Sequence, residues 1–148
     1  MKCQQNLETF LEFCFENFEV AVWTTATKPY AEEILRRILK DNQRLQFIWT
    51  RERCTLAFDE DEREHFFVKK MYKLRRRGYK PKSVIVVDDS PNVWKTSFGN
   101  LVRVSQFEGD ENDEELKFLP IYLEKLKDVE NVRVIEKRNW RSRIKWDF

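Results

Sequence analysis

The chain has few of the residues that form turns, disulfide bonds or metal sites: its 148 residues include 3 Gly, 4 Pro, 3 Cys and 1 His. Cys3, Cys14 and Cys54 are odd in number, lie far apart and form no Cys-x-x-Cys pair. This pattern argues against a disulfide framework and against a zinc site. We expect reduced thiols, with Cys14 in the core. The single histidine, His65, is expected to pack or to lie on the surface rather than to bind a metal.

Long hydrophobic runs are also absent. The longest apolar stretches, such as Val20–Trp23, are far shorter than the roughly 18 residues that a transmembrane helix needs. The first nine residues lack the apolar segment of a signal peptide. We therefore expect no membrane association and a cytoplasmic location. With 41% hydrophobic and 36% charged residues, the composition is typical of a folded chain, and the length predicts a single domain over residues 1–148.

Charge is unevenly distributed along a chain whose net charge is only +2. The segment 137–148 carries five basic residues and one acid, interleaved with Trp140 and Trp146. Such a basic tail could contact nucleic acid or an acidic partner. A solvated, partly amphipathic terminal segment explains the same pattern. We favour that second interpretation, so nucleic acid is not an expected partner.

The most informative stretch is Ser83–Pro91, a run of β-branched residues that ends in Asp88 and Asp89. Four consecutive Val or Ile residues without alternation predict a strand covered on both faces, as in a parallel sheet. Ligands of such sheets bind at the carboxyl ends of the strands. Two adjacent carboxylates repel each other there unless a cation or bonded protons hold them. Mg²⁺, held by one or two carboxylates with waters and a phosphate, would fit.

A structural role explains the same residues. Asp, Ser and Pro are all common at the start of a helix, so Asp88 or Asp89 could cap a helix that begins at Pro91. The local sequence leaves the cap and the metal site as open alternatives.

Hydrophobic periodicity predicts alternating helices and strands along the whole chain. The expected helices are 7–18, 30–41, a segment from Lys69, 93–98 and 113–127, and the expected strands are 18–23, 45–49, 84–87 and 101–104. Residues 54–58 and 64–68 flank an acidic segment and predict a surface hairpin with a charged tip. Arg75–Arg77 should face solvent before Gly78 ends their helix, and the acids 110–115 favour the start of the last helix. This alternation predicts a three-layer α/β domain.

Three kinds of polar group are expected at one edge of the sheet. Thr24 follows the first strand, Lys69 starts a helix, and the two aspartates follow the Val84–Val87 strand. A hydroxyl donor, an ammonium and a metal-holding acid pair are what a phosphoryl site needs. Receiver domains use similar groups, but their acid pair closes the first strand. The order found here excludes that class.

The motifs that carry a family resemblance occur in order along nearly the whole chain. They are Val22-Trp23-Thr24, Tyr30-Ala31-Glu32, Arg51-Glu52-Arg53-Cys54, Val68-Lys69, Val87-Asp88-Asp89-Ser90-Pro91 and the later segments 99–104, 107–110, 131–133 and 136–138. In this order the sequence resembles the haloacid-dehalogenase (HAD) superfamily, and more narrowly its branch of carboxy-terminal-domain (CTD) and NLI-interacting-factor-like phosphatases.

The resemblance implies a role for each site residue. Thr24 would hold the phosphate through its hydroxyl, and Lys69 would neutralise the phosphoryl charge. Asp89, assisted by Asp88, would bind Mg²⁺. The substrate would be a phosphoprotein or another phosphoester, and the fold a three-layer Rossmann-like, mostly parallel HAD sheet with a small β-hairpin insertion. Lys70 departs from the acid that often follows the lysine in relatives.

One family motif is missing. Members begin with a strand that ends Asp-x-Asp-x-Thr, whose first Asp is phosphorylated, and no such segment precedes Leu7. Asp59-Glu60-Asp61 has apolar residues before it but lacks the following Thr and lies in the predicted hairpin. The acids at Asp110 and Asp113 precede a helix without a buried strand. Because the missing strand is normally the centre of the sheet, its absence predicts exposed strand edges and self-association.

Three hypotheses follow. The first is a Mg²⁺-dependent phosphatase-type domain, incomplete at its N-terminus and non-catalytic because the nucleophile is absent. The second is a module that binds phosphate or a partner, with use of the basic tail as one variant. The third is a chain that starts late within an ordinary enzyme.

Overall fold

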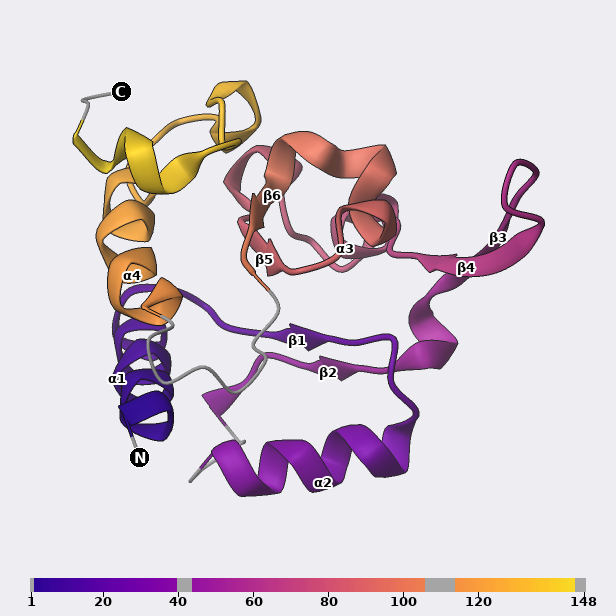
Figure 1. The fold of residues 1–148 in the computed structure, drawn as a ribbon, viewed down its shortest axis with the longest axis horizontal. Helices are drawn as coiled ribbons and strands as arrows, with labels where there is room; N and C mark the ends of the chain where they lie inside the picture. The colour runs from indigo at the N-terminus through magenta and orange to yellow at the C-terminus, as the bar shows by residue number, and fades with distance from the viewer. Residues whose placement is uncertain (1, 40–43, 106–113, 146–148) are drawn as a thin grey trace. The chain divides into compact units, whose positions relative to one another are not determined.

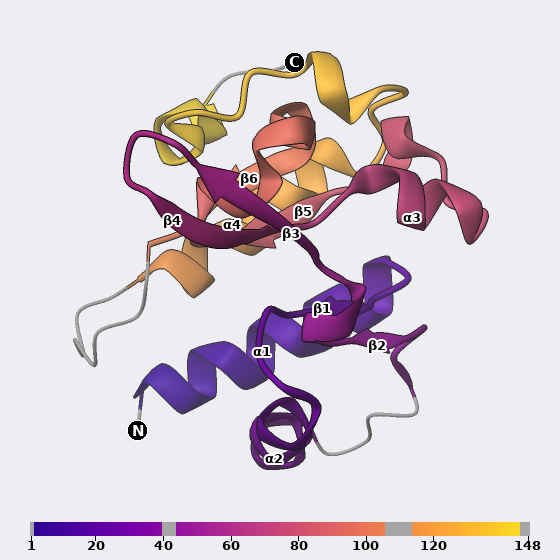
Figure 2. The ribbon, with the colours of Figure 1, turned by 90° about the vertical axis from the view of Figure 1, so that its right-hand side faces the viewer.

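The computed structural model describes residues 2–39, 44–105 and 114–145, with side chains described from residue 6 onward. Figures 1 and 2 show the ribbon from two directions. The chain divides into two compact units, residues 1–67 and 68–148, which we describe one at a time. No helix in the described ranges is long and apolar enough to cross a membrane. The cytoplasmic location stays a prediction.

The first unit alternates helices with short strands. Its elements are α1 (Lys2–Asn17), β1 (Val22–Trp23), α2 (Lys28–Ile38), β2 (Ile48–Trp49), the 3₁₀ turn η2 (Arg51–Arg53), β3 (Thr55–Asp59) and β4 (Glu64–Val68). β1 and β2 are parallel, with Val22 opposite Ile48. Helix α2 runs alongside this pair (Figure 1) and buries Ala31 and Leu35. These elements confirm the predicted order of helix and strand.

The β1–β2 pair is held by more than its short strands suggest. Backbone hydrogen bonds continue the pairing from the Gln46 amide to the Val20 carbonyl (2.8 Å) and from the Thr24 amide to the Trp49 carbonyl (2.9 Å). Trp49 is 5% exposed and packs edge-on against Trp23, with ring centroids 4.8 Å apart. This packing orders the end of β1, where Thr24 lies.

The hairpin β3–β4 has the predicted charged tip. The Asp59 carboxylate accepts hydrogen bonds from the amides of Asp61 (2.9 Å) and Glu62 (3.2 Å). Arg63 closes the turn with a positive φ of 54°. Asp59 and Asp61 thus shape a surface turn, which agrees with their rejection as a nucleophile motif. His65 is exposed and contacts the Phe58 ring at 5.0 Å between centroids.

The second unit surrounds a parallel pair of strands. Its elements are α3 (Met71–Arg76), η3 (Pro81–Ser83), β5 (Val86–Asp88), η4 (Pro91–Asn100), β6 (Leu101–Arg103), α4 (Glu115–Leu126), η5 (Val132–Val134) and η6 (Trp140–Lys145). Arg75–Arg77 are exposed and Gly78 ends the α3 region with a φ of 102°, as predicted. The acids 110–113, including the expected helix start at Asp113, lie outside the described residues.

The strands confirm an α/β fold with mostly parallel pairing but not a single sheet. Within the described residues, the six strands form three two-stranded sheets. β5 pairs with β6 and spans Val86–Asp88 instead of the predicted 84–87, because the Val84 amide still bonds back to the Pro81 carbonyl (3.2 Å) at the end of η3. The expectation that this strand is covered on both faces is wrong. Val86 is buried, but Val87, which points to the opposite face, is 38% exposed.

The basic tail packs more closely than the solvated, partly amphipathic segment that we expected, although most of its described residues are exposed. Lys137 is 5% exposed, and its Nζ donates to the carbonyls of Gly99, Val132 and Ile135. These bonds use all three donors of the ammonium group. Trp140 is 3% exposed and donates from Nε1 to the Arg103 carbonyl (2.6 Å). Residues 137–145 therefore belong to the folded unit, whereas Trp146 lies outside the described residues.

Trp140 should be a main support of the second unit, because its ring also packs against Tyr122 at 5.6 Å between centroids. We expect Trp140→Ala to lower the free energy of unfolding by about 3–5 kcal/mol. Trp140→Phe, which keeps a ring but loses the bond to Arg103, should cost less. Urea unfolding followed by circular dichroism measures both. A cost below about 1 kcal/mol for Trp140→Ala would contradict this role.

Burial should also separate the reactivity of two cysteines. Cys14 lies in the core as predicted, and burial raises the pKa of its thiol to about 12. Cys54 is half-buried. Because the thiolate is the reactive form, we expect iodoacetamide to modify Cys54 about tenfold faster or more in the folded protein at mildly alkaline pH. Peptide mass spectrometry measures the two rates, and equal rates would contradict the burial of Cys14.

Candidate functional site

The candidate site begins at the carboxyl end of β5. Asp88 is the last residue of the strand and lies opposite Arg103 of β6. Its carbonyl accepts a hydrogen bond from the Val104 amide at 3.0 Å, so the backbone is held by the neighbouring strand. The side chain is thereby placed at the sheet edge where ligands of parallel sheets bind.

Three donors hold the Asp88 carboxylate. Lys69 Nζ and Trp94 Nε1 both donate to Oδ2 at 2.9 Å, and the Ser90 amide donates to Oδ1 at 3.1 Å. The bond from Ser90 closes a tight turn before η4, which Pro91 opens. One Asp88 oxygen thus supports the turn before η4, whose N-cap residue Ser90 makes no side-chain cap bond, and the other oxygen pairs with the Lys69 ammonium. The Mg²⁺ site stays a prediction.

Lys69 reaches this carboxylate from just before α3, not from within the helix as we expected. Its amide donates to the Val93 carbonyl at 2.8 Å, which ties this extended stretch to η4. The Lys69 side chain is only 6% exposed, and the Asp88 side chain 15%. The Lys69 ammonium lies over the face of the Trp94 ring, with Nζ 5.7 Å from the ring centroid. The result is a buried ion pair with an indole as a shared partner.

The two aspartates have opposite electrostatic environments. Burial alone would raise the pKa of Asp88, but the Lys69 ammonium and the hydrogen bonds from Lys69, Ser90 and Trp94 together hold that pKa below its ordinary value. Burial raises the pKa of Asp89, and the neighbouring Asp88 carboxylate raises it further. Asp89 is exposed and is thus the member of the pair that is open to a new ligand.

The donor set can be tested against Mg²⁺. A carboxylate offers about four lone-pair sites, and hydrogen bonds occupy three of those of Asp88. Asp89 keeps more of its acceptor capacity, and a cation would relieve the repulsion that raises its pKa. No group of three or more His, Cys, Asp or Glu side chains suited to a metal occurs in the described part of the chain. The two aspartates fit an ion that takes its remaining ligands from water and phosphate.

Thr24 lies directly after β1 in the first unit. Its hydroxyl accepts a hydrogen bond from the Ala26 amide at 3.1 Å, and the residue is half-buried. A hydroxyl that accepts in this way keeps its own proton for donation. The structure thus brings Lys69 and Asp88 together, with Asp89 next in the chain. The part of Thr24 in the site stays a prediction.

The sequence interpretation missed Trp94. This residue is 3% exposed, donates to Asp88 and lies below Lys69. The sequence does contain a signal for this contact. Trp94 lies six residues after Asp88, in a turn that Pro91 opens, and such a turn brings the chain back toward the end of the strand. A buried indole also needs a partner for its N–H.

We expect the Lys69–Asp88 pair to be strongly coupled. Lys69→Met leaves a carboxylate without its cation and should lower the free energy of unfolding by about 3–5 kcal/mol. The further change Asp88→Asn should recover part of this loss in the double variant. Lys70→Met is the matched control, because Lys70 is adjacent and forms no ion pair within the described residues. Equal losses for Lys69→Met and Lys70→Met in chemical unfolding would contradict the coupling.

Comparisons with known proteins identify the family of this chain. A sequence model of the NLI interacting factor-like phosphatase family matches residues 1–133. CTD small phosphatase-like protein 2 of Dictyostelium discoideum is 29% identical over 126 residues, which are 85% of this chain and 20% of that protein. A probable C-terminal domain small phosphatase of the same organism is 30% identical over 135 residues, 90% of this chain and 41% of that protein.

More distant matches extend the comparison. The putative CTD phosphatase-like protein 355R of Invertebrate iridescent virus 6 is 28% identical over 133 residues, 84% of this chain and 70% of that protein. The solved structure of the fission yeast RNA polymerase II CTD phosphatase Fcp1, bound to beryllium fluoride, is also similar, with a TM-score of 0.56 and 18% identity. The match covers 94% of this chain and 44% of the Fcp1 chain. That likeness shows a shared fold.

The chain thus spans about a fifth and two fifths of the lengths of the two Dictyostelium relatives. The family match covers most of its residues and includes Lys69, Asp88 and Asp89. The chain belongs to the NLI interacting factor-like phosphatase family, within the HAD superfamily.

Proposed function

We propose that this chain is a phosphatase-type domain that binds Mg²⁺ and the phosphate of a phosphoprotein or another phosphoester without hydrolysing it. The observation that carries the proposal is the buried Asp88 carboxylate, which Lys69 and Trp94 share, with the exposed Asp89 beside it. An ammonium held next to two carboxylates provides one positive group for phosphate and two anionic groups for a metal.

Each residue has a distinct task in this proposal. Asp89 and Asp88 would hold Mg²⁺, which when bound would neutralise phosphate charge. Lys69, fixed by Asp88, would present its ammonium to phosphate oxygens, and Thr24 would donate its hydroxyl to them. Trp94 would act as a positioning residue, because it orients Asp88 and limits the movement of Lys69.

The absence of turnover is proposed from the motif content of the sequence. The 148 residues contain no Asp-x-Asp-x-Thr segment. Covalent phosphoryl transfer to an aspartate requires that nucleophile, however well the other groups are placed. The proposal concerns these residues alone and makes no statement about what precedes or follows them.

The architecture is part of the same proposal. We propose that the two units together make one three-layer domain of the HAD type. In the described residues each strand of a parallel pair bonds to one neighbouring strand, so its other edge is unpaired. Unpaired strand edges promote association between chains. We therefore also propose weak self-association.

The alternative in which the basic tail binds nucleic acid has less support. Lys137 is buried, Arg138 pairs with Glu136 at 2.8 Å, and Arg141 pairs with Glu115 at 3.4 Å. These contacts leave less free positive charge on the tail than its sequence suggests.

The proposal predicts metal binding without turnover. Isothermal titration calorimetry should detect Mg²⁺ binding that Asp89→Asn weakens about tenfold or more, because the most open carboxylate ligand is lost. Asp128→Asn, an exposed acid on the surface after α4, is the matched control and should bind normally. In the presence of Mg²⁺, phosphate release from p-nitrophenyl phosphate or a phosphopeptide should stay at the level without protein.

Two results would count against this account. Equal Mg²⁺ affinity in Asp89→Asn and Asp128→Asn would remove the metal site. The second is robust phosphate release that is abolished by Asp89→Ala but is unaffected by substitutions at Asp59 and Asp61. This result would refute the proposal that the domain is non-catalytic and would require a nucleophile that we have not identified.

A further inference from the structure

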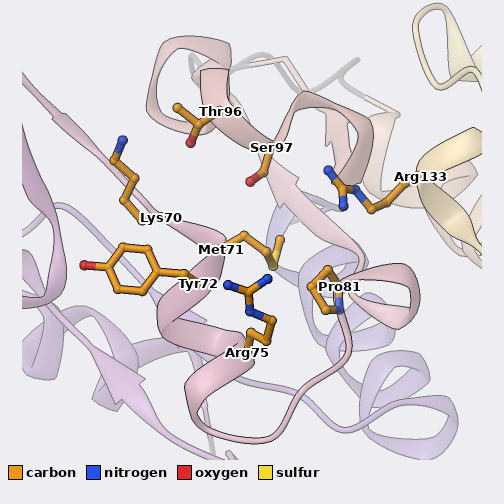
Figure 3. Close-up of a pocket in the computed structure, with 8 residues that line it drawn as sticks. All are labelled: Lys70, Met71, Tyr72, Arg75, Pro81, Thr96, Ser97 and Arg133. Atoms are coloured by element: carbon orange, nitrogen blue, oxygen red, sulfur yellow. The ribbon is translucent and has the colours of Figure 1, made fainter.

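A pocket in the second unit lies outside the candidate site. It has a volume of about 270 Å³ (Figure 3), enough for a phosphate group and several waters, since a water occupies about 30 Å³ in the liquid. Side chains from α3, η3, η4 and η5 surround it: Lys70, Met71, Tyr72, Arg75, Pro81, Thr96, Ser97 and Arg133.

The charged side chains that line the pocket are all positive. Lys70, Arg75 and Arg133 are cationic, and none of the eight lining residues is acidic. None of these three cations forms an ion pair with another described residue, whereas Arg138 and Arg141 each pair with a glutamate. The pocket therefore holds positive charge that an anionic ligand would neutralise.

Ser97 provides a hydroxyl inside this pocket. The residue is 5% exposed, and its side chain points into the space between Met71 and Arg133 (Figure 3). Ser97 has a non-helical backbone (φ −140°, ψ 42°), which interrupts η4 at this point. No described residue forms a hydrogen bond with this hydroxyl. The Ser97 Oγ is not among the buried side-chain atoms that lack a partner in the described residues, so water can reach it, and the pocket offers a hydroxyl donor to a ligand.

Arg133 is held at the pocket by its backbone. Its amide donates to the Asn131 side chain at 3.0 Å. A Cβ on Gly99 would lie 3.0 Å from the Arg133 carbonyl oxygen, so the glycine permits this close approach. Lys137 ties Gly99 to Val132 by donating to both carbonyls. The backbone that carries the guanidinium is therefore fixed before any ligand binds.

The pocket is separate from the Lys69–Asp88 pair even though Lys69 and Lys70 are adjacent. Lys70 has an extended backbone (φ −92°, ψ 122°), and successive side chains of extended chain point to opposite sides. Lys69 points to Asp88, whereas Lys70 lines the pocket.

We propose that this pocket is a second anion site, which binds a phosphate group through Arg75, Arg133, Lys70 and the Ser97 hydroxyl. Guanidinium groups bind phosphate oxygens with two parallel hydrogen bonds, and Ser97 supplies a neutral donor. The phosphate is either inorganic phosphate or the phosphomonoester group of a larger ligand. Met71, Pro81 and Tyr72 form an apolar wall that only the second kind of ligand would use.

The test is an NMR titration of the labelled protein without Mg²⁺, using inorganic phosphate and, separately, phosphoserine. We expect saturable shifts of the Ser97 and Arg133 amides with both probes. Arg133→Gln and Ser97→Ala should each weaken binding, Arg133→Gln by about tenfold or more, because a hydrogen bond to a charged group is lost. Arg76→Gln is the matched control, because Arg76 is an exposed arginine of α3, next to Arg75, that does not line the pocket.

The outcomes separate the ligand sources. Equal affinity for the two probes identifies the phosphate group alone as the ligand, and tighter binding of phosphoserine identifies a phosphomonoester that also contacts the apolar wall. Absence of saturable shifts at Ser97 and Arg133, or equal affinity in Arg133→Gln and Arg76→Gln, would overturn the proposal. Shifts at Asp89 and Ser90 report the Lys69–Asp88 site separately, so either site can fail alone. Circular dichroism confirms that each variant is folded.

Discussion

The buried ion pair between Lys69 and Asp88 is the interaction on which the candidate site depends. A carboxylate that is 15% exposed is costly unless charge and hydrogen bonds compensate its lost hydration. Lys69, Trp94 and the Ser90 amide provide that compensation. The same contacts join the end of β5, the start of η4 and the stretch before α3. A site that binds charge is thus also a fixed junction of three segments.

The two aspartates have different roles in this arrangement. Asp88 is satisfied internally and keeps Lys69 in place, whereas Asp89 is exposed and repelled by its neighbour. An ion pair alone would be stable without any ligand. In the proposed function, the second carboxylate would make the site receptive to a cation, and the lysine would make it receptive to phosphate. Neither property requires a nucleophile.

Much of this could be predicted from the sequence, because β-branched runs and helical periodicity depend on local pattern. The order of helices and strands, the charged hairpin tip and the burial of Cys14 followed from that pattern. The exposure of Val87 did not, because it depends on which elements cover β5. The burial of Lys137 and Trp140 was missed for a similar reason. Their carbonyl partners at Gly99 and Arg103 are remote in sequence, so charge composition alone suggested a solvated tail. Trp94 was overlooked because its role depends on the path of η4 back to the strand end.

The central claim is that Asp89, beside the Lys69–Asp88 pair, binds a divalent cation. The most direct test is ¹³C NMR of the aspartate carboxyl carbons during a Mg²⁺ titration. The account predicts a saturable shift of Asp89, a smaller one of Asp88, and none of the exposed Asp128. A shift of Asp89 no larger than that of Asp128 would contradict the account.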